Sequence, residues 1–228
     1  MADAARKLTT RLRLVGDIAE FIVTADDPIY QDRIIHMGWR PVDDHSFVRR
    51  LSATQDVERI HENFARHLEE MVLQSARLRP VAWQTALEEF LVRVDDTGLS
   101  WWLYGSGALA VRGLDVDPGD LDFVVDDAHI AGRIFGDLLV EPVTRLEGWV
   151  AEWGGRAFHG ALFEWVANVD PALDAEPHEQ GRAAAGRLET VIWRGHRLRV
   201  PPLELQLATA IRCGFNERAA KIHQAMAG

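Results

Sequence analysis

The first third of the chain carries hydrophobic residues at strand-like and helix-like spacings in turn. Val57, Ile60, Phe64 and Leu68 recur every three or four residues, which is typical of an amphipathic helix. The pattern predicts, in order, a strand, a short helix, a strand and a long helix, over residues 16–25, 27–38, 40–51 and 55–76. We therefore expect a β-α-β-α unit over residues 12–78, after a frayed start at residues 1–10.

The rest of the chain continues this mixture of helix and strand signals. Helices are predicted at residues 80–98, 108–112, 128–139, 201–213 and 216–226. Apolar runs and hairpin signals predict strands at residues 101–104, 120–125, 149–169 and 191–200. Residues 171–187 are rich in Ala, Gly and acidic residues, and we expect a loop there. Together these elements predict an α+β protein.

The most informative stretch begins at Trp101 and centres on a turn of small residues. The apolar run 101–104 is short enough for a buried strand, and it ends at Gly105-Ser106-Gly107. Small residues let the backbone turn sharply and approach a ligand closely. A helix predicted directly after this turn directs free N–H groups at whatever lies in front of it, which favours a phosphate.

Two acidic residues follow this turn at strand spacing. Asp120 and Asp122 lie two residues apart, so in a strand their side chains project from the same face. Neighbouring carboxylates repel each other unless a cation joins them. Mg²⁺, a hard cation that prefers oxygen ligands, is the simplest candidate. A phosphate-binding turn beside an acidic pair indicates phosphoryl or nucleotidyl transfer.

This combination resembles the nucleotidyltransferase superfamily that includes DNA polymerase beta. The family signature is a hydrophobic residue, Gly, Gly or Ser, a gap, and then Asp-hydrophobic-Asp/Glu-hydrophobic. Here Tyr104-Gly105-Ser106 is followed by thirteen residues and then by Asp120-Leu121-Asp122-Phe123. The Trp-Trp pair and the Ala-Leu-Ala-Val-Arg-Gly helix look most like the small antibiotic-modifying branch and its uncharacterised relatives. The resemblance covers residues 100–126 well and the remainder loosely.

The resemblance implies a polymerase beta-like core, a mixed sheet flanked by helices. We expect this core in a nucleotidyltransferase domain over residues 80–228, ending in a hairpin and helices. Residues 1–79 would form an α/β accessory subdomain, for which the sequence offers no chemical motif.

The resemblance also implies an activity and its cofactors. An Mg²⁺-dependent enzyme, with two ions, would transfer a nucleoside monophosphate from a nucleoside triphosphate such as ATP to a hydroxyl group. Its partners would be the triphosphate and a small-molecule acceptor. Gly105 and Ser106 would hold the phosphates, while Asp120 and Asp122 would hold the metal ions.

The family places a third carboxylate on a strand next to the two aspartates. Glu164 fits this role, because a lone acid inside an apolar strand is costly without a partner. Asp170 is the alternative, although the following Pro171 is more typical of a turn. Relatives also end with a basic helix facing the site, which implies a phosphate contact for Lys221 or Arg218. The Asp that relatives carry after this Lys is missing here.

Composition limits the other possibilities. The 228 residues carry a net charge of −10, which argues against general nucleic-acid binding. The charge is uneven, because residues 180–228 hold +5 and residues 1–179 therefore −15. The single cysteine, Cys213, excludes an internal disulfide and a Cys-based zinc cluster. Without an apolar run of membrane-spanning length, we expect a cytoplasmic protein that does not enter a membrane.

Two other functions stay open from the sequence. One is a toxin–antitoxin-type nucleotidyltransferase that modifies a protein or a tRNA. The other is a catalytically inactive nucleotide-binding or regulatory module of the same fold. The intact Ser106, Asp120 and Asp122 favour an enzyme, whereas Glu at position 164 slightly favours the inactive module. The sequence does not specify the acceptor or the oligomeric state.

Overall fold

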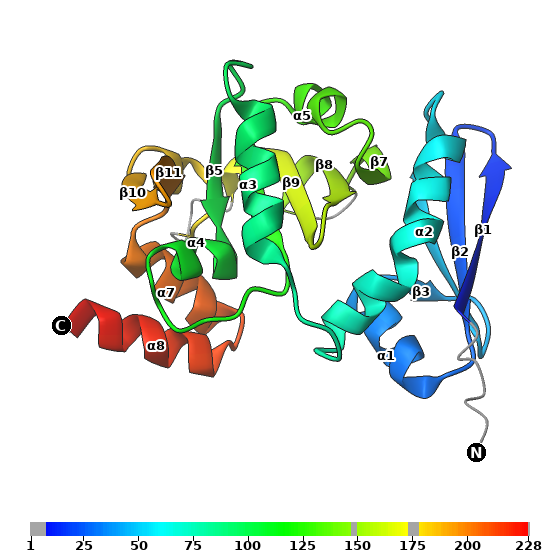
Figure 1. Ribbon diagram of the computed structural model, residues 1–228, viewed down its shortest axis with the longest axis horizontal. Coiled ribbons are helices and arrows are strands. Elements are labelled where there is room, and N and C mark those ends of the chain that lie inside the picture. Colours follow the sequence, from blue (N-terminus) through cyan, green and yellow to red (C-terminus); the bar gives the residue numbers. More distant parts are fainter. Residues whose placement is uncertain (1–7, 147–149, 173–177, 228) are drawn as a thin grey trace.

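Two β-sheets, one from the first third of the chain and one from its middle, organise the molecule (Figure 1). The computed structural model describes residues 8–146, 150–172 and 178–227. The first described residue, Leu8, belongs to the first sheet, and the last described helix lies on the opposite side of the molecule (Figure 1).

The first sheet has four antiparallel strands in the order β1-β2-β4-β3. Its strands are β1 (Leu8–Val15), β2 (Ile18–Ala25), β3 (Arg40–Pro41) and β4 (Ser46–Ser52). Two helices, α1 (Pro28–His36) and α2 (Val57–Ser75), cover one face, where Phe21 of β2 packs against Phe64 of α2. Asp27 begins α1 by accepting a hydrogen bond from the Ile29 N–H.

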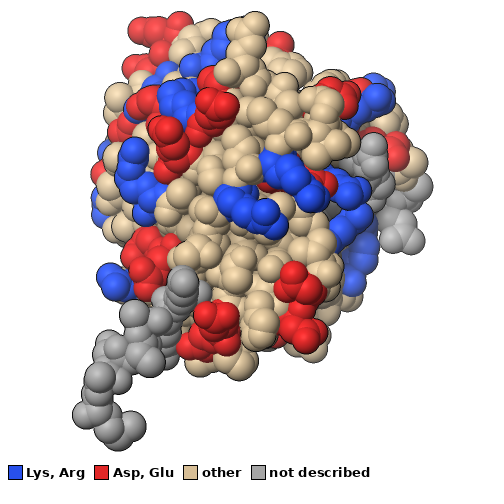
Figure 2. Space-filling view, turned by 90° about the vertical axis from the view of Figure 1, so that its right-hand side faces the viewer, with Lys and Arg blue, Asp and Glu red and all other residues tan. Residues whose placement is uncertain are grey.

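The opposite face of this sheet carries basic side chains. Arg11 and Arg13 of β1 and Arg50 of β4 are exposed. They share this face because strand residues two apart lie on one side and paired residues on neighbouring strands face the same way. Figure 2 views the molecule from this side and shows blue side chains gathered near the middle of the face.

The first strand corrects the expectation of a frayed start over residues 1–10. Residues 8–10 belong to β1, which pairs with β2 along its whole length. Gly16 connects the two strands in a left-handed conformation, with φ +62°, which a glycine adopts at little cost. In β1 the half-buried Leu8, Thr10 and Leu12 alternate with exposed residues, and such an alternation in a sequence predicts an edge strand.

The second sheet is mixed, with five strands in the order β5-β6-β9-β8-β7. They are β5 (Trp101–Tyr104), β6 (Leu121–Val125), β7 (Leu139–Arg145), β8 (Ala151–Phe158) and β9 (Leu162–Val169). Only β6 and β9 pair in parallel. Helices α3 (Trp83–Val94) and α5 (Ala128–Ile134) pack on one face, where Phe90 stacks on Phe123 at 3.7 Å. The predicted α+β class, with a mixed sheet flanked by helices, is confirmed.

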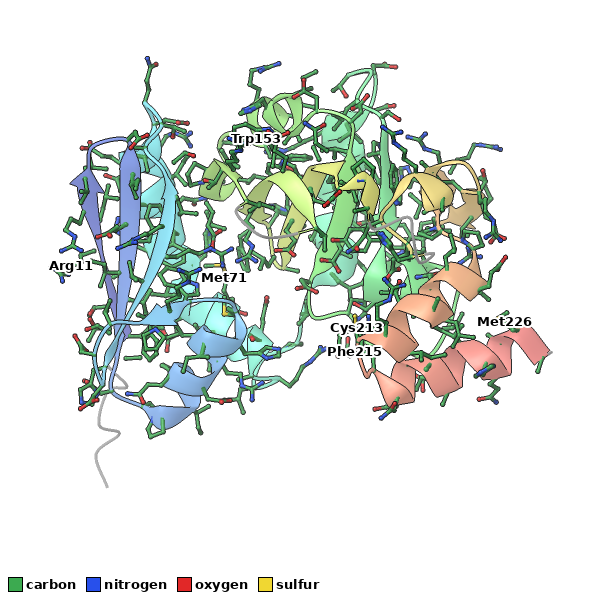
Figure 3. The ribbon with its side chains drawn as sticks, turned by 180° about the vertical axis from the view of Figure 1, so that it is seen from behind. Arg11, Met71, Trp153, Cys213, Phe215 and Met226 are labelled. Atoms are coloured by element: carbon green, nitrogen blue, oxygen red, sulfur yellow. The ribbon has the colours of Figure 1, made fainter. Side chains whose placement is uncertain are left out.

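The end of the chain packs beside the glycine turn. It contains α6 (Arg182–Ala185), the hairpin β10 (Glu189–Trp193) and β11 (His196–Val200), then α7 (Leu203–Arg212) and α8 (Asn216–Ala227). Ala210 of α7 and Ile222 of α8 share a small apolar cluster with Leu109 of α4 (Gly105–Val111). Figure 3 shows Cys213 and Phe215 at the turn between α7 and α8. A hairpin followed by helices therefore ends the chain, as expected.

A continuous hydrophobic core joins the two sheets. Asn63 of α2 donates a hydrogen bond to the Leu139 carbonyl of β7, at 2.9 Å. The Ser52 N–H of β4 donates to Thr144 Oγ1 of β7, at 3.0 Å. Residues 76–82 connect the two parts, and the division into domains at residue 79 stays a prediction. Across the described ranges, no helix is both long and apolar enough to span a membrane.

Candidate active site

A row of polar side chains crosses all five strands of the second sheet. Register places these residues directly opposite one another from β5 to β7: Tyr104, Asp122, Glu164, Arg156 and Glu141. Paired residues project to the same side, whereas Phe123 and Phe163 point to the opposite face, toward α3 and α5. The row therefore lies on the face of the sheet that these helices leave open.

The glycine turn lies directly against one of the aspartates. Gly105 has φ +66°, and a Cβ added to it would lie 2.6 Å from Asp122 Oδ2. Both observations require glycine here, one for the backbone conformation and one for space. Asp120 lies just before β6 rather than inside it. The predicted turn is in fact the first turn of α4, which begins at Gly105 rather than at residue 108. The structure brings this turn and the acidic pair together.

The two aspartates hold their protons unusually strongly. Burial, and then the nearby Glu164 carboxylate, raises the pKa of Asp120 to about 6. Burial also raises the pKa of Asp122 well above its usual value, and the charges of Asp120 and Glu164 add to this. Such shifts indicate carboxylates crowded together without enough positive charge.

Glu164 has the opposite character because it has cationic partners. Burial alone would raise its pKa, but the Arg156 and Arg49 guanidinium groups outweigh burial and lower it. Arg156 Nε donates a hydrogen bond to Glu164 Oε2 at 2.6 Å, and the Asp122 side chain also hydrogen-bonds to Glu164. Glu164 is therefore ionised and held in one place. The alternative, Asp170, is exposed and accepts a hydrogen bond from the Ala172 N–H in a turn.

The acidic residues have the donor chemistry of a hard divalent cation. Within the described residues, no three His, Cys, Asp or Glu side chains are already gathered as a metal-binding group. Asp120 and Asp122 nevertheless offer oxygen ligands whose mutual repulsion a cation would relieve. The residues present therefore fit Mg²⁺, with one oxygen of Glu164 already engaged by Arg156.

A hollow of about 320 Å³ lies beside the glycine turn, under the start of α8. It brings together the predicted phosphate ligands Ser106 and Lys221, and its lining is Ser106, Val116, Asp117, Phe215, Asn216, Glu217, Arg218 and Lys221. Lys221 Nζ donates to the Asp115 carbonyl at 2.7 Å and pairs with Glu217 at 3.1 Å. Gly105 shapes the turn but is not part of this lining.

Arg218 connects this hollow to the acidic residues. Its guanidinium lies over the Phe215 ring, 4.7 Å from the ring centre. Its positive charge also lowers the pKa of both Asp120 and Asp122, although burial outweighs it. The hollow therefore has a hydroxyl group, an aromatic ring, the two cations Arg218 and Lys221, and the two carboxylates Asp117 and Glu217.

A second hollow, of about 440 Å³, has a different lining. Its lining consists of four residues of α1 and four at the end of α2: Pro28, Ile29, Asp32, Arg33, Ser75, Ala76, Arg77 and Leu78. Ser106 and Lys221, the predicted phosphate ligands, line the first hollow and not this one, so the larger volume does not make it the better candidate.

Two further residues clamp the glycine turn. Glu179 is buried, and its Oε2 accepts a hydrogen bond from the Gly105 N–H at 2.9 Å. Gln206 of α7 donates to the Gly105 carbonyl at 3.2 Å and to Glu179 at 3.3 Å. Burial raises the pKa of Glu179 despite these hydrogen bonds. Both backbone polar groups of Gly105 are thus held by later segments of the chain.

Sequence reasoning missed Glu179 and Gln206, which hold the glycine turn, and it missed Arg156 in the row. Glu179 falls in the segment expected to be a loop, and Gln206 looks like an ordinary helix residue. Arg156 has one usable signal, because an Arg inside an apolar strand needs an acidic partner as much as Glu164 does.

Comparisons with known proteins give distant structural likenesses. No family model and no curated protein matches the sequence at a significant level. Among solved structures, a candidate nucleotidyltransferase from Thermotoga maritima is 20% identical, with a TM-score of 0.49 over 63% of this chain and 92% of its own. The antibiotic-resistance factor ANT(2'')-Ia is 14% identical, with a TM-score of 0.44 over 63% and 84% of the two chains.

The lincosamide antibiotic adenylyltransferase LnuA is 11% identical, with a TM-score of 0.43 over 64% of this chain and 98% of its own. All three carry nucleotidyltransferase or antibiotic-resistance names. Identities and TM-scores this low do not transfer an activity to the present chain.

Proposed function

We propose that this protein is a nucleotidyltransferase that works with Mg²⁺. It transfers a nucleoside monophosphate from a nucleoside triphosphate, with ATP favoured, to a hydroxyl group of a small molecule. One observation carries the proposal: Asp122 of the half-buried Asp120–Asp122 pair lies against Gly105, and the next residue, Ser106, lines a hollow that also contains Arg218 and Lys221.

The chain's own residues divide the work of such a reaction. Ser106 donates a hydrogen bond to a terminal phosphate oxygen, while Arg218 and Lys221 offset phosphate charge. Asp120 and Asp122 hold the divalent cation. When bound, the cation supplies positive charge to the phosphates and to the attacking and leaving oxygens.

Glu164 has the protonation state of a general base. It is ionised near neutral pH and so can take the proton of the attacking hydroxyl group, although its lowered pKa makes it a weaker base than a free carboxylate. The hydroxyl oxygen forms a bond to the α-phosphorus as the bond between that phosphorus and the bridging oxygen breaks. Pyrophosphate leaves with the bridging oxygen, and the acceptor carries the nucleoside monophosphate.

Thermal unfolding with a non-hydrolysable ATP analogue tests binding, with and without Mg²⁺. A ligand that binds only the folded state raises the melting temperature. We expect a rise of several degrees in wild type, and loss of its Mg²⁺-dependent part in Asp120→Asn/Asp122→Asn. Asp126→Asn is the matched control, because Asp126 is exposed beyond the end of β6. Equal shifts in wild type and the double variant would contradict the metal site.

Mass spectrometry of hydroxyl-bearing small molecules incubated with ATP and the protein tests transfer. We expect one acceptor to gain the mass of a nucleoside monophosphate, with release of pyrophosphate. An inactive nucleotide-binding module is the second candidate, because Glu164 is already bonded to Arg156. Nucleotide binding without pyrophosphate release across the acceptor panel would favour that module.

A further inference from the structure

The polar row of the second sheet continues into the first sheet. Arg49 lies on β4, opposite Phe21 of β2, and therefore on the face that α1 and α2 cover, where it also meets Glu141 of β7. Its Nε lies 3.0 Å from Glu141 Oε2, and Glu141 Oε1 lies 3.3 Å from Arg156 Nη1. Arg156 in turn bonds Glu164. Alternating charges thus run from the N-terminal unit to the candidate active site.

Arg49 is held firmly at the start of this chain of charges. Its Nη1 donates to the Met37 carbonyl at 3.0 Å, at the end of α1. Its side chain is 19% exposed, whereas that of the adjacent Arg50, on the opposite face, is 67% exposed. Arg50 instead pairs with Glu20, far from the second sheet. Two neighbouring arginines therefore have entirely different surroundings.

Arg156 lies between two carboxylates that compete for it. Its contact with Glu164 is short, at 2.6 Å, and its contact with Glu141 is longer, at 3.3 Å. We attribute the difference to sharing, because Glu141 also contacts Arg49 directly, at 3.0 Å, whereas Arg49 acts on Glu164 only through space. If Arg49 lost its charge, Glu141 would attract Arg156 more strongly in this poorly solvated region.

We propose that Arg49 is a positioning residue for Glu164. It satisfies Glu141 and so leaves Arg156 free to fix the Glu164 carboxylate beside Asp122. The N-terminal unit then completes the active site rather than being a separate accessory. The inference rests on the proposed function for the role of Glu164 in catalysis, but the contact itself is tested independently.

Crystal structures of wild type, Arg49→Met and Arg50→Met test the contact. In Arg49→Met we expect the Arg156 guanidinium to move toward Glu141, so that its Nε no longer lies within hydrogen-bonding distance of Glu164. In Arg50→Met the contact should persist. An unchanged contact in Arg49→Met overturns the proposal. If that variant does not fold, Arg49→Gln replaces it with the same expectation, because it also removes the charge.

Metal binding provides a second readout besides activity. Mn²⁺ titration followed by electron paramagnetic resonance, with a non-hydrolysable ATP analogue present, should show about 10–100-fold weaker binding in Arg49→Met, the usual loss when a residue supporting a metal ligand is removed. Arg50→Met should bind as wild type, and Arg49→Lys should recover part of the affinity. A structural role alone would lower the melting temperature and leave Mn²⁺ affinity unchanged.

Kinetics separate this proposal from the proposed function. We expect Arg49→Met to lower kcat with little change in KM for ATP, because the hollow at Ser106 lies outside the row. Should wild type transfer nothing, the proposed function fails, and the Mn²⁺ titration still tests Arg49. Should wild type bind no Mn²⁺ either, the crystal structures alone decide whether Arg49 positions Glu164.

Discussion

Within this site, the pKa values of similar carboxyl groups are shifted in opposite directions. Asp120 and Glu164 are both poorly exposed, yet the pKa of Asp120 is raised and that of Glu164 is lowered. The difference lies in their partners, since Glu164 has a guanidinium within hydrogen-bonding distance and the aspartates mainly have other carboxylates. Groups whose pKa values diverge in this way are typical of acid–base and metal chemistry.

Asp120 should make the metal-free protein less stable as the pH rises. Its folded pKa, about 6, lies above the unfolded value of about 3.9, so the folded state binds the proton more strongly. The stability that this gives is complete below pH about 4 and is lost as the pH rises through about 6. Asp120→Asn cannot lose a proton, so it should gain stability relative to wild type between pH 5 and pH 8.

Chemical denaturation in EDTA at several pH values measures this difference. One unit of pKa shift corresponds to about 1.4 kcal/mol, so the relative gain should not exceed a few kcal/mol. Adding Mg²⁺ at pH 8 should remove the advantage of Asp120→Asn by stabilising wild type. A stability difference that does not change with pH would show that Asp120 titrates normally.

Gly105 should be far less tolerant of a methyl group than another glycine of the same backbone class. Gly105→Ala meets both a left-handed conformation, costing about 1–2 kcal/mol, and the Asp122 carboxylate. Gly113→Ala is the control, because Gly113 has φ +88° with nothing within 4 Å of an added Cβ.

Urea unfolding and Mn²⁺–nucleotide titration measure the two effects. Both alanine variants should lose stability, but only Gly105→Ala should displace Asp122 and weaken Mn²⁺ binding. Equal losses of metal affinity in the two variants would show that the contact between Gly105 and Asp122 is unimportant.

At the scale of elements, local signals located the site and long-range pairing completed it. The strand–turn–helix around Gly105 and the strand after Asp120 are visible in sequence, because small residues and alternating acids have meaning within a few positions. By contrast, β7 begins where the sequence predicts the end of a helix, and its hydrophobic pattern suits either structure. Glu141 and Arg156 meet only through the pairing of β7 with β8, which no local pattern specifies.

Helix α7 should control the glycine turn through Gln206. Gln206→Leu removes the donor to the Gly105 carbonyl and to buried Glu179, and hydrogen bonds to charged groups contribute about 1.5–3 kcal/mol each. We expect a stability loss of about 2 kcal/mol and a higher KM for ATP, since the turn carries Ser106. Gln224→Leu, on the exposed side of α8, is the matched control.

Urea unfolding and steady-state kinetics separate the two consequences of this change. If Gln206→Leu lost stability with an unchanged KM, the clamp would be structural only. An effect of the same size in Gln224→Leu would point to a general sensitivity of the terminal helices.

At the scale of the whole molecule, the shared core predicts that the two sheets unfold together. Phe64 and Leu68 of α2 belong to the same apolar cluster as Phe163 and Trp165 of β9, so the main core spans both sheets. Trp39 stacks on Phe64 and reports on the N-terminal unit, whereas the other tryptophans lie from residue 83 onward. Far-ultraviolet circular dichroism and tryptophan fluorescence should therefore give coincident urea transitions.

A Trp39→Phe variant makes this test specific, because its fluorescence comes from the second part of the chain alone. Its midpoint should coincide with that of circular dichroism, and Asn63→Ala, which removes the hydrogen bond to β7, should shift both signals by the same amount. Separate midpoints would instead establish the division at residue 79 as one between independent domains. Coincident midpoints would mean that Arg49 and Glu164 are held in register by one cooperative structure, as the charge row requires.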